Sequence, residues 1–214
     1  MSKLRLFLFS DHVTPANRAL DDHLLSEVGK SSPSVAWIPA GSRPEKVPDF
    51  FEARRRAYAD HGVSDVDMFP LHADFDSARV PWLLSRDIIH LSGGDPFVFL
   101  RNLRATGMLP ILRQWALDGG VLVGDSAGAM LMTPSLEITR IGDAPVPPDL
   151  TDLRALGLTD FEFNPHFGTY GGSAEQLTKY AKDKGVIVYG APDGCGLALM
   201  RGNLVHHGAV VRFN

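Results

Sequence analysis

The sequence of 214 residues has a single cysteine, Cys195, no long apolar run and no excess of basic residues. One cysteine excludes an internal disulfide framework and a zinc ribbon, and it suits a reducing compartment. The apolar segment over residues 4–9 is too short for a signal peptide, and Asp11 follows it at once. No run approaches the roughly 20 residues of a membrane-spanning helix. We therefore expect a cytoplasmic protein.

The charge balance is mildly acidic, with a formal net charge of −4. There is no basic stripe for nucleic acid and no polybasic segment for a membrane surface. The chain also lacks the G-x-G-x-x-G spacing and the lysine of a phosphate-binding loop, which argues against nucleotide binding. We expect no nucleic-acid partner, no membrane partner, no cofactor and no metal. No surface pattern decides the oligomeric state, so a homodimer stays open.

Short apolar runs alternate with helical patterns along the chain. Strands are predicted over residues 4–9, 35–38, 63–71, 87–91, 121–123, 186–189, 197–200 and 205–211, and helices over 16–28, 50–60, 97–104, 109–117 and 173–184. This alternation favours parallel strands joined by right-handed crossovers. The prediction is a single α/β domain over residues 1–214, folded as a three-layer α/β/α sandwich with a mostly parallel central sheet.

Three local patterns add detail to this plan. Arg54, Arg55 and Arg56 are interpreted as the solvated face of their helix. The helix over 173–184 begins with Ser173 and has a glutamine three residues on, which is a capping-box pattern. The proline-rich stretch over 133–152 is predicted to have little regular structure and to run over the surface near the site.

The segment Gly124-Asp125-Ser126-Ala127-Gly128 directly follows an apolar strand. Its form, G-x-S-x-G at a strand-to-helix turn, is typical of a nucleophile elbow. Such a turn lifts the serine hydroxyl off the sheet and sets it over a helix N-terminus, where backbone N–H groups favour developing negative charge. We interpret Ser126 as a nucleophile. The alternative is a turn rich in Gly and Ser that only connects a strand to a helix.

A serine nucleophile needs a base to take its proton and a third group to orient that base. His166 is the candidate base, because it follows an Asn-Pro turn in an apolar segment; the alternative is a partly buried histidine satisfied by backbone groups. Asp193 is the candidate acid, although Asp-Gly after proline is also a common turn sequence. For the oxyanion, the N–H of Ala127 and the backbone of Gly93-Gly94 are the candidate donors.

Four segments, in this order, together resemble the peptidase E and cyanophycinase family of serine peptidases. They are Gly93-Gly94-Asp95, Gly124 to Ala129, Asn164 to Phe167, and Gly190 to Gly194. The family has a fold like the class I glutamine amidotransferase domain, with serine at the nucleophile position. The resemblance implies Ser126 as nucleophile, His166 as general base, Asp193 as acid, and Gly94 and Ala127 as oxyanion donors.

Two departures from the family pattern bear on the substrate. The usual acid is glutamate, where this chain has Asp193. Peptidase E also has an arginine soon after the histidine that grips an N-terminal aspartate, and residues 168–173 contain none. Arg140 or Arg201 are possible replacements from elsewhere in the chain, because a carboxylate clamp needs a cation.

Four further residues are predicted to contact substrate: Asp95, Asp125, Asn164 and Tyr170. Of these, Asp125 has two interpretations. It fixes a substrate amino group, or it faces away and caps the following helix, and we favour the cap.

The expected function is a serine peptidase that cleaves short peptides, Asp-X dipeptides among them, through an acyl-enzyme. One alternative is an esterase of the α/β-hydrolase type. That fold runs nucleophile, acid, histidine, and would use an acid such as Asp152 followed by His206 or His207. The other alternative is a non-catalytic, ligand-binding homologue.

Overall fold

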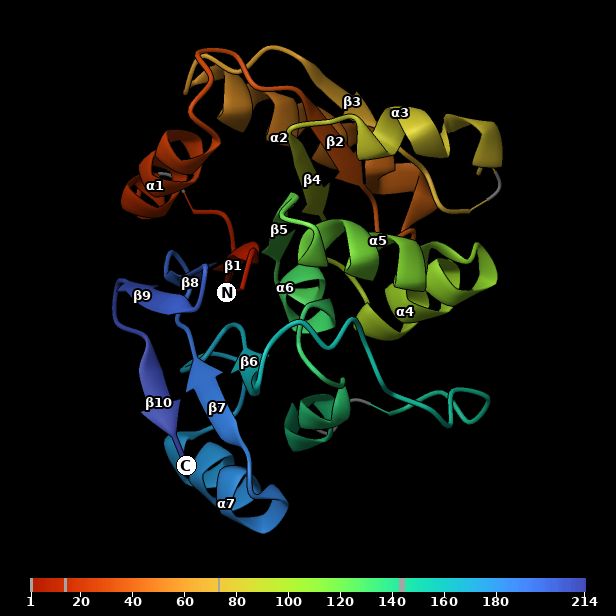
Figure 1. The fold of residues 1–214 in the computed structure, drawn as a ribbon. Helices are drawn as coiled ribbons and strands as arrows, with labels where there is room; N and C mark the ends of the chain where they lie inside the picture. Colours follow the sequence, from red (N-terminus) through yellow and green to blue (C-terminus); the bar gives the residue numbers. More distant parts are fainter. Residues whose placement is uncertain (1, 14, 73, 143–144) are drawn as a thin grey trace.

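A seven-stranded sheet forms the centre of the computed structural model, which describes residues 2–13, 15–72, 74–142 and 145–214 (Figure 1). Its strand order is β3-β2-β4-β5-β1-β8-β9. The first five in this order run parallel, and β8 and β9 are antiparallel additions at the edge beside β1. The strands are β1 (Arg5–Phe9), β2 (Val35–Ile38), β3 (Val66–Met68), β4 (Ile88–Leu91), β5 (Val121–Asp125), β8 (Gly196–Met200) and β9 (Asn203–His207).

Helices cover both faces of this sheet, because successive side chains of each strand point to opposite sides. Along β1, Leu6 and Leu8 belong to one buried cluster, and Phe7 and Phe9 belong to the other. Helices α1 (Arg18–Val28) and α2 (Val47–Ala59) contribute to the cluster of Phe7. The opposite cluster takes side chains from α3 (Val80–Leu84), α4 (Pro96–Ala105), α5 (Met108–Leu117) and α6 (Ala127–Leu131). The predicted three-layer α/β/α sandwich is confirmed.

A second, three-stranded sheet lies beside the first, in the order β10-β7-β6 (Figure 1). It consists of β6 (Phe161–Asn164), β7 (Ile187–Gly190) and β10 (Val211–Phe213), with α7 (Ala174–Lys184) packed against it. The prediction of one strand over 205–211 is wrong. Gly208 has φ +81°, which no strand adopts, and the chain there leaves β9 in one sheet and enters β10 in the other.

Most predicted elements are present with ends shifted by one to three residues. The capping box is confirmed: the Gln176 N–H donates to Ser173 Oγ at 3.2 Å, and the Ser173 N–H donates to Gln176 Oε1 at 2.8 Å. Helix α3 was not predicted. The chain also forms short 3-10 helices, η1 (Pro44–Lys46), η2 (Ser77–Arg79) and η3 (Glu137–Gly142). Across the described residues, every helix is too short or too polar to cross a membrane.

The stretch over 133–152 has more structure than predicted. It contains η3, and a β-bridge joins Ser135 to Arg154. Ile138 is buried and, with Thr139, lines a pocket of about 980 Å³, so the stretch does run beside that pocket. Asp143 and Ala144 lie outside the described residues.

The strand ends explain where that pocket forms. In parallel sheets, ligands bind beyond the carboxyl ends of the strands. Residues that follow β4, β5 and β6 all line the pocket: Ser92 and Gly93, Ser126, and Pro165 and His166. Sequentially distant loops thus meet at one place between the two sheets.

Helix α6 passes so close to β4 that a glycine is needed at the crossing. A Cβ on Gly128 would lie 2.2 Å from the Leu91 carbonyl oxygen, which is backbone and cannot move aside. We expect Gly128→Ala to lower the free energy of unfolding by about 1–3 kcal/mol, the usual effect of overpacking. Chemical denaturation measures it.

Gly93→Ala is the matched control, because a Cβ on Gly93 would meet nothing closer than 3.6 Å. Its free energy of unfolding should stay within about 0.5 kcal/mol of that of the unaltered protein. Equal denaturation midpoints for the two variants would contradict the close crossing.

Candidate active site

Ser126 occupies the tight turn between β5 and α6. Its backbone has φ 45° and ψ −107°, a strained conformation for a residue with a side chain, and such strain costs about 1–3 kcal/mol. Two features hold it there. The Ser126 N–H donates to the Phe9 carbonyl at 3.0 Å, and a Cβ on Gly124 would lie 2.5–2.6 Å from the backbone of the next turn. The strained turn at the centre of the G-x-S-x-G segment is the geometry that the motif predicts.

Three predicted side chains form a continuous hydrogen-bonded chain. Ser126 Oγ lies 2.8 Å from His166 Nε2, and His166 Nδ1 lies 2.6 Å from Asp193 Oδ1. His166 is buried, with 8% of its surface exposed, and it has a positive φ of 57°. A carboxylate at Nδ1 favours the tautomer with the proton on Nδ1, which leaves Nε2 as the acceptor facing the serine. The aspartate in place of the family's glutamate therefore reaches the histidine.

Ser10 follows β1 and connects the end of the central sheet to the loops that carry His166 and Asp193. Its Oγ accepts a hydrogen bond from the His166 N–H at 2.7 Å and donates to the Ala191 carbonyl at 2.8 Å. The same Oγ lies 3.3 Å from Asp193 Oδ1. Since Ser10 is fully buried, its hydroxyl is held between the loops that carry His166 and Asp193.

Two backbone N–H groups are the candidate oxyanion donors, those of Gly94 and Ala127. Within the described residues, neither the Gly94 N–H nor the Ala127 N–H has an acceptor. Gly94 has φ +140°, and a Cβ there would lie 2.8 Å from the Ala40 side chain. Only glycine can place its N–H in this position. Ala127 follows Ser126 directly, and Gly94 lines the same pocket as Ser126, so both have, within the described part of the chain, the free N–H group that an oxyanion hole needs.

The four predicted substrate residues all line the pocket, but three of them, Asp95, Asn164 and Asp125, are engaged in structural contacts. Asp95 Oδ1 caps α4 by accepting from the N–H groups of Phe97 and Val98 at 2.8 and 3.0 Å. Asn164 is buried, and its Nδ2 donates to the Gly171 carbonyl. Tyr170 is 70% exposed and stacks on the His166 ring, with ring centroids 4.3 Å apart.

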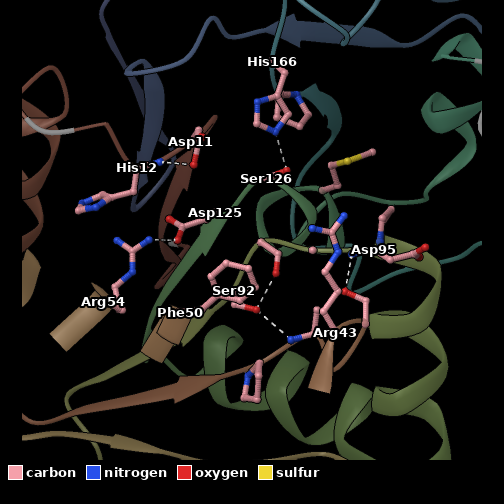
Figure 2. Close-up of a pocket in the computed structure, with 18 of the residues that line it drawn as sticks. Asp11, His12, Arg43, Phe50, Arg54, Ser92, Asp95, Asp125, Ser126 and His166 are labelled. Atoms are coloured by element: carbon pink, nitrogen blue, oxygen red, sulfur yellow. Dashed lines mark hydrogen bonds and ion pairs between the residues drawn. The ribbon is translucent and has the colours of Figure 1, made fainter. Parts of the chain in front are cut away.

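Asp125 does not cap α6, so the favoured interpretation is wrong. Its carboxylate is buried and pairs through Oδ2 with the guanidinium of Arg54, which reaches across from α2 (Figure 2). The interpretation of Arg54 as part of a solvated face is wrong for the same reason: its side chain is only 13% exposed, whereas Arg55 and Arg56 pair with Glu52 at the surface.

A buried histidine completes this charged cluster. His90 Nε2 lies 3.0 Å from Asp125 Oδ2, although it is not aligned for a hydrogen bond, and His90 Nδ1 lies 2.7 Å from the Tyr58 hydroxyl. Burial lowers the pKa of His90 and raises that of Tyr58, because it disfavours the charged form of each side chain. Burial opposes ionisation of Asp125 as well, but the Arg54 charge, with His90, holds the pKa of that carboxyl well below its usual range.

The pocket over these groups has a volume of about 980 Å³, within the range of small-molecule sites. Asp152, His206 and His207, the residues that an esterase order would need, do not line it. Asp152 pairs with Arg154, and His207 lies 3.0 Å from His23.

One cluster in the pocket offers three metal-ligand atoms. Atoms of Asp11, His166 and Asp193 lie within 4.8 Å of one another. Two of these residues are already hydrogen-bonded to each other, and exposed carboxylates commonly gather without a metal. The cluster alone does not establish a metal site.

Four residues of the site were missed in the sequence: Ser10, Asp11, Arg43 and Arg54. Ser10 and Asp11 directly follow the predicted first strand, and the rule that places sites at carboxyl ends of parallel strands points to them. No signal in the sequence singles out Arg43 or Arg54, because only the folded chain brings α2 and the loop before it to the end of β5.

Comparison with known proteins places the chain among peptidases. The sequence model of Peptidase family S51 matches residues 6–206. Peptidase E of Streptomyces coelicolor is 31% identical over 212 residues, which cover 91% of this chain and 80% of that protein. The uncharacterized peptidase PM1590 of Pasteurella multocida is 30% identical over 138 residues, or 64% of this chain, and the match spans just under two thirds of that relative, 66%.

Solved structures show the same fold. A Listeria monocytogenes EGD-e protein superposes with a TM-score of 0.71 at 23% identity, over 98% of this chain and 97% of that one. A peptidase from an acI-B1 Actinobacterium gives a TM-score of 0.67 at 18% identity, over 98% and 96%. The resemblance to the peptidase E family drawn from four short segments is confirmed.

The Asp125 charge should matter for stability. We expect Asp125→Asn to lower the free energy of unfolding by about 3–5 kcal/mol, because it leaves the Arg54 charge buried without its partner. Asp149→Asn, in an exposed pair with Arg101, should cost less than about 1 kcal/mol.

The pH dependence follows from the lowered pKa of Asp125. A carboxyl whose pKa is lower in the folded state contributes stability above its unfolded pKa, about 3.9, and loses it progressively at lower pH. The difference in the free energy of unfolding between the unaltered protein and Asp125→Asn should therefore become smaller below about pH 4. Urea titrations at several pH values measure this difference. A difference that stays constant with pH would contradict the ion pair.

Proposed function

The chain belongs to peptidase family S51, and we propose that it acts as a serine peptidase on short peptides. One observation carries this proposal: the hydrogen-bonded chain from Ser126 through His166 to Asp193, with contacts of 2.8 and 2.6 Å. A nucleophile, a base within reach and a group that orients the base are the parts that acyl transfer needs.

The reaction begins at Ser126. Its Oγ attacks the scissile carbonyl carbon while His166 Nε2 takes the hydroxyl proton. The carbonyl oxygen becomes an oxyanion, which accepts hydrogen bonds from the N–H groups of Gly94 and Ala127. A donor of this kind typically contributes about 3–4 kcal/mol to transition-state stabilisation. The partial positive charge at the N-terminus of α6 acts in the same direction.

The intermediate then collapses. The C–N bond breaks, and His166 Nε2 returns its proton to the leaving amine, which departs and leaves an ester on Ser126. Water attacks this ester, again with His166 as base, and the acid product leaves. Asp193 accepts the Nδ1–H throughout, so it keeps the imidazole in the required tautomer and stabilises its charged form.

The substrate is a short peptide in this proposal, with Asp-X dipeptides as the finer candidate. Support comes from the volume of the pocket, about 980 Å³, and from the family, in which Peptidase E of Streptomyces coelicolor is a relative. We further propose that residues 1–214 act as one catalytic domain in the cytoplasm. A shared buried core supports the single domain, since one cluster includes Leu6 of the central sheet and Phe163 and Val188 of the second. A homodimer stays a prediction.

An esterase of the α/β-hydrolase type is less well supported. The histidine beside Ser126 precedes the acid in the chain, which is the opposite of the order in that fold.

The proposal is tested by profiling dipeptides and tripeptides with purified variants. We expect Ser126→Ala and His166→Ala to lower kcat/KM by on the order of 10⁴–10⁶, because each removes a group that acts in the chemical step. Asp193→Asn should lower it by about 10⁴, since the amide favours the wrong histidine tautomer.

His207→Ala is the matched control, because this histidine lies outside the pocket and should leave turnover unchanged. Full turnover by Ser126→Ala would rule out the serine mechanism. An inactive His207→Ala beside an active His166→Ala would favour the esterase order. Inertness toward every peptide, together with tight binding of one, would identify a ligand-binding homologue.

A further inference from the structure

Neither arginine suggested by the sequence as a carboxylate clamp reaches the pocket. Arg140 pairs with Glu137 at 2.9 Å, and Arg201 pairs with Glu27 at 3.2 Å; neither lines the pocket. Two other arginines do line it, Arg43 and Arg54. The two arginines differ in exposure and in ion pairing, and these properties decide which of them is available to a ligand.

Arg54 is neutralised by the protein itself. Its guanidinium pairs with Asp125, which is buried, and its own side chain is mostly covered. Arg43 is exposed, on the loop between β2 and η1, and in the described part of the chain no acidic side chain lies within ion-pair distance of it. Figure 2 shows its side chain extending into the pocket, between Ser126 and Asp95. The Asp95 carboxylate beside it is engaged in capping α4.

Asp11 provides the opposite charge on the other side of the serine (Figure 2). It follows β1, is exposed, and lies close enough to His166 and Asp193 for their polar atoms to fall within 4.8 Å of one another. Its carboxylate accepts a hydrogen bond from the His12 N–H at 2.8 Å. Among the described residues, no lysine or arginine pairs with it.

The two charged groups lie on either side of Ser126 in Figure 2, and among the residues that the structure describes neither has an oppositely charged side chain paired with it. A guanidinium offers paired N–H donors that match a carboxylate, and a carboxylate accepts hydrogen bonds from an ammonium group. A group that carries both charges a few bonds apart fits this arrangement better than a neutral or singly charged one.

We propose that the pocket selects its peptides by charge at two places: Arg43 binds a substrate carboxylate, and Asp11 binds the substrate's free amino group. This inference rests on the proposed peptidase function and assigns its specificity. The carboxylate has two possible sources, an acidic side chain or the C-terminal carboxylate of a dipeptide. The Ser126 chemistry is the same in both cases.

The experiment compares kcat and KM for matched peptides: Asp-Leu against Asn-Leu, each peptide against its C-terminal amide, and each against its N-acetyl form. The enzymes are the unaltered protein, Arg43→Gln and Asp11→Asn. Arg140→Gln is the matched control, because it removes a surface arginine that lies outside the pocket. Ser126→Ala is assayed in parallel, so that failure of the peptidase function is recognised separately.

We expect Arg43→Gln to raise KM about 10–100-fold for the peptide that carries the recognised carboxylate, with little change in kcat, because one charged hydrogen-bonding partner is lost. Loss of the Asp-Leu preference over Asn-Leu identifies the side chain as the source. Loss of the preference for the free acid over the amide identifies the C-terminus. If both preferences survive in Arg43→Gln, the role of Arg43 is overturned.

Asp11→Asn should abolish the preference for a free over an acetylated amino group, again through KM. An unchanged preference would overturn the role of Asp11. In both cases a dead Ser126→Ala shows that the peptidase function stands while the specificity inference falls. If Ser126→Ala cleaves the same peptides as fast as the unaltered protein, the function itself fails, whatever Arg43→Gln does.

Discussion

The geometry of the site depends on one buried hydroxyl, that of Ser10, which joins the two sheets. Ser126 belongs to the central sheet, whereas His166 and Asp193 follow strands of the second sheet. Ser10 accepts from the His166 N–H, a buried backbone group that needs an acceptor. It also donates to the Ala191 carbonyl, which accepts a second hydrogen bond from the Phe167 N–H. These bonds hold the loop of His166 and the residue after β7 against the end of β1.

Burial sorts the charged groups around the pocket into two kinds. Asp125 is buried and the Arg54 side chain is only 13% exposed, so each needs the other, and their pairing joins α2 to the end of β5. Arg43 and Asp11 face solvent, where a charge needs no partner within the protein. The first pair shapes the turn that carries Ser126, and the second pair is open to a ligand.

The same distinction explains which parts of the fold could be predicted. Strand 35–38 has the predicted ends, and the capping box at Ser173 forms as expected, because both depend on neighbouring residues. The strand over 205–211 was mispredicted, because valines at both ends of the run favour a strand while Gly208 turns the chain from one sheet to the other. Arg54 was misplaced because its two neighbouring arginines are solvated and nothing local marks it as different.

The sequence by itself determined the strand-to-helix turn at Ser126, the choice of His166 and Asp193 as its partners, and the family. These follow from short motifs whose residue types and order are legible without coordinates. Only the tertiary structure decided that Asp125 is paired to Arg54, that Ser10 joins the two sheets, and that Arg43 lines the pocket without such a partner among the described residues. The physical reason is that each of these contacts joins segments far apart in the chain, and charge pairing in a folded protein depends on burial and distance, which no local pattern encodes.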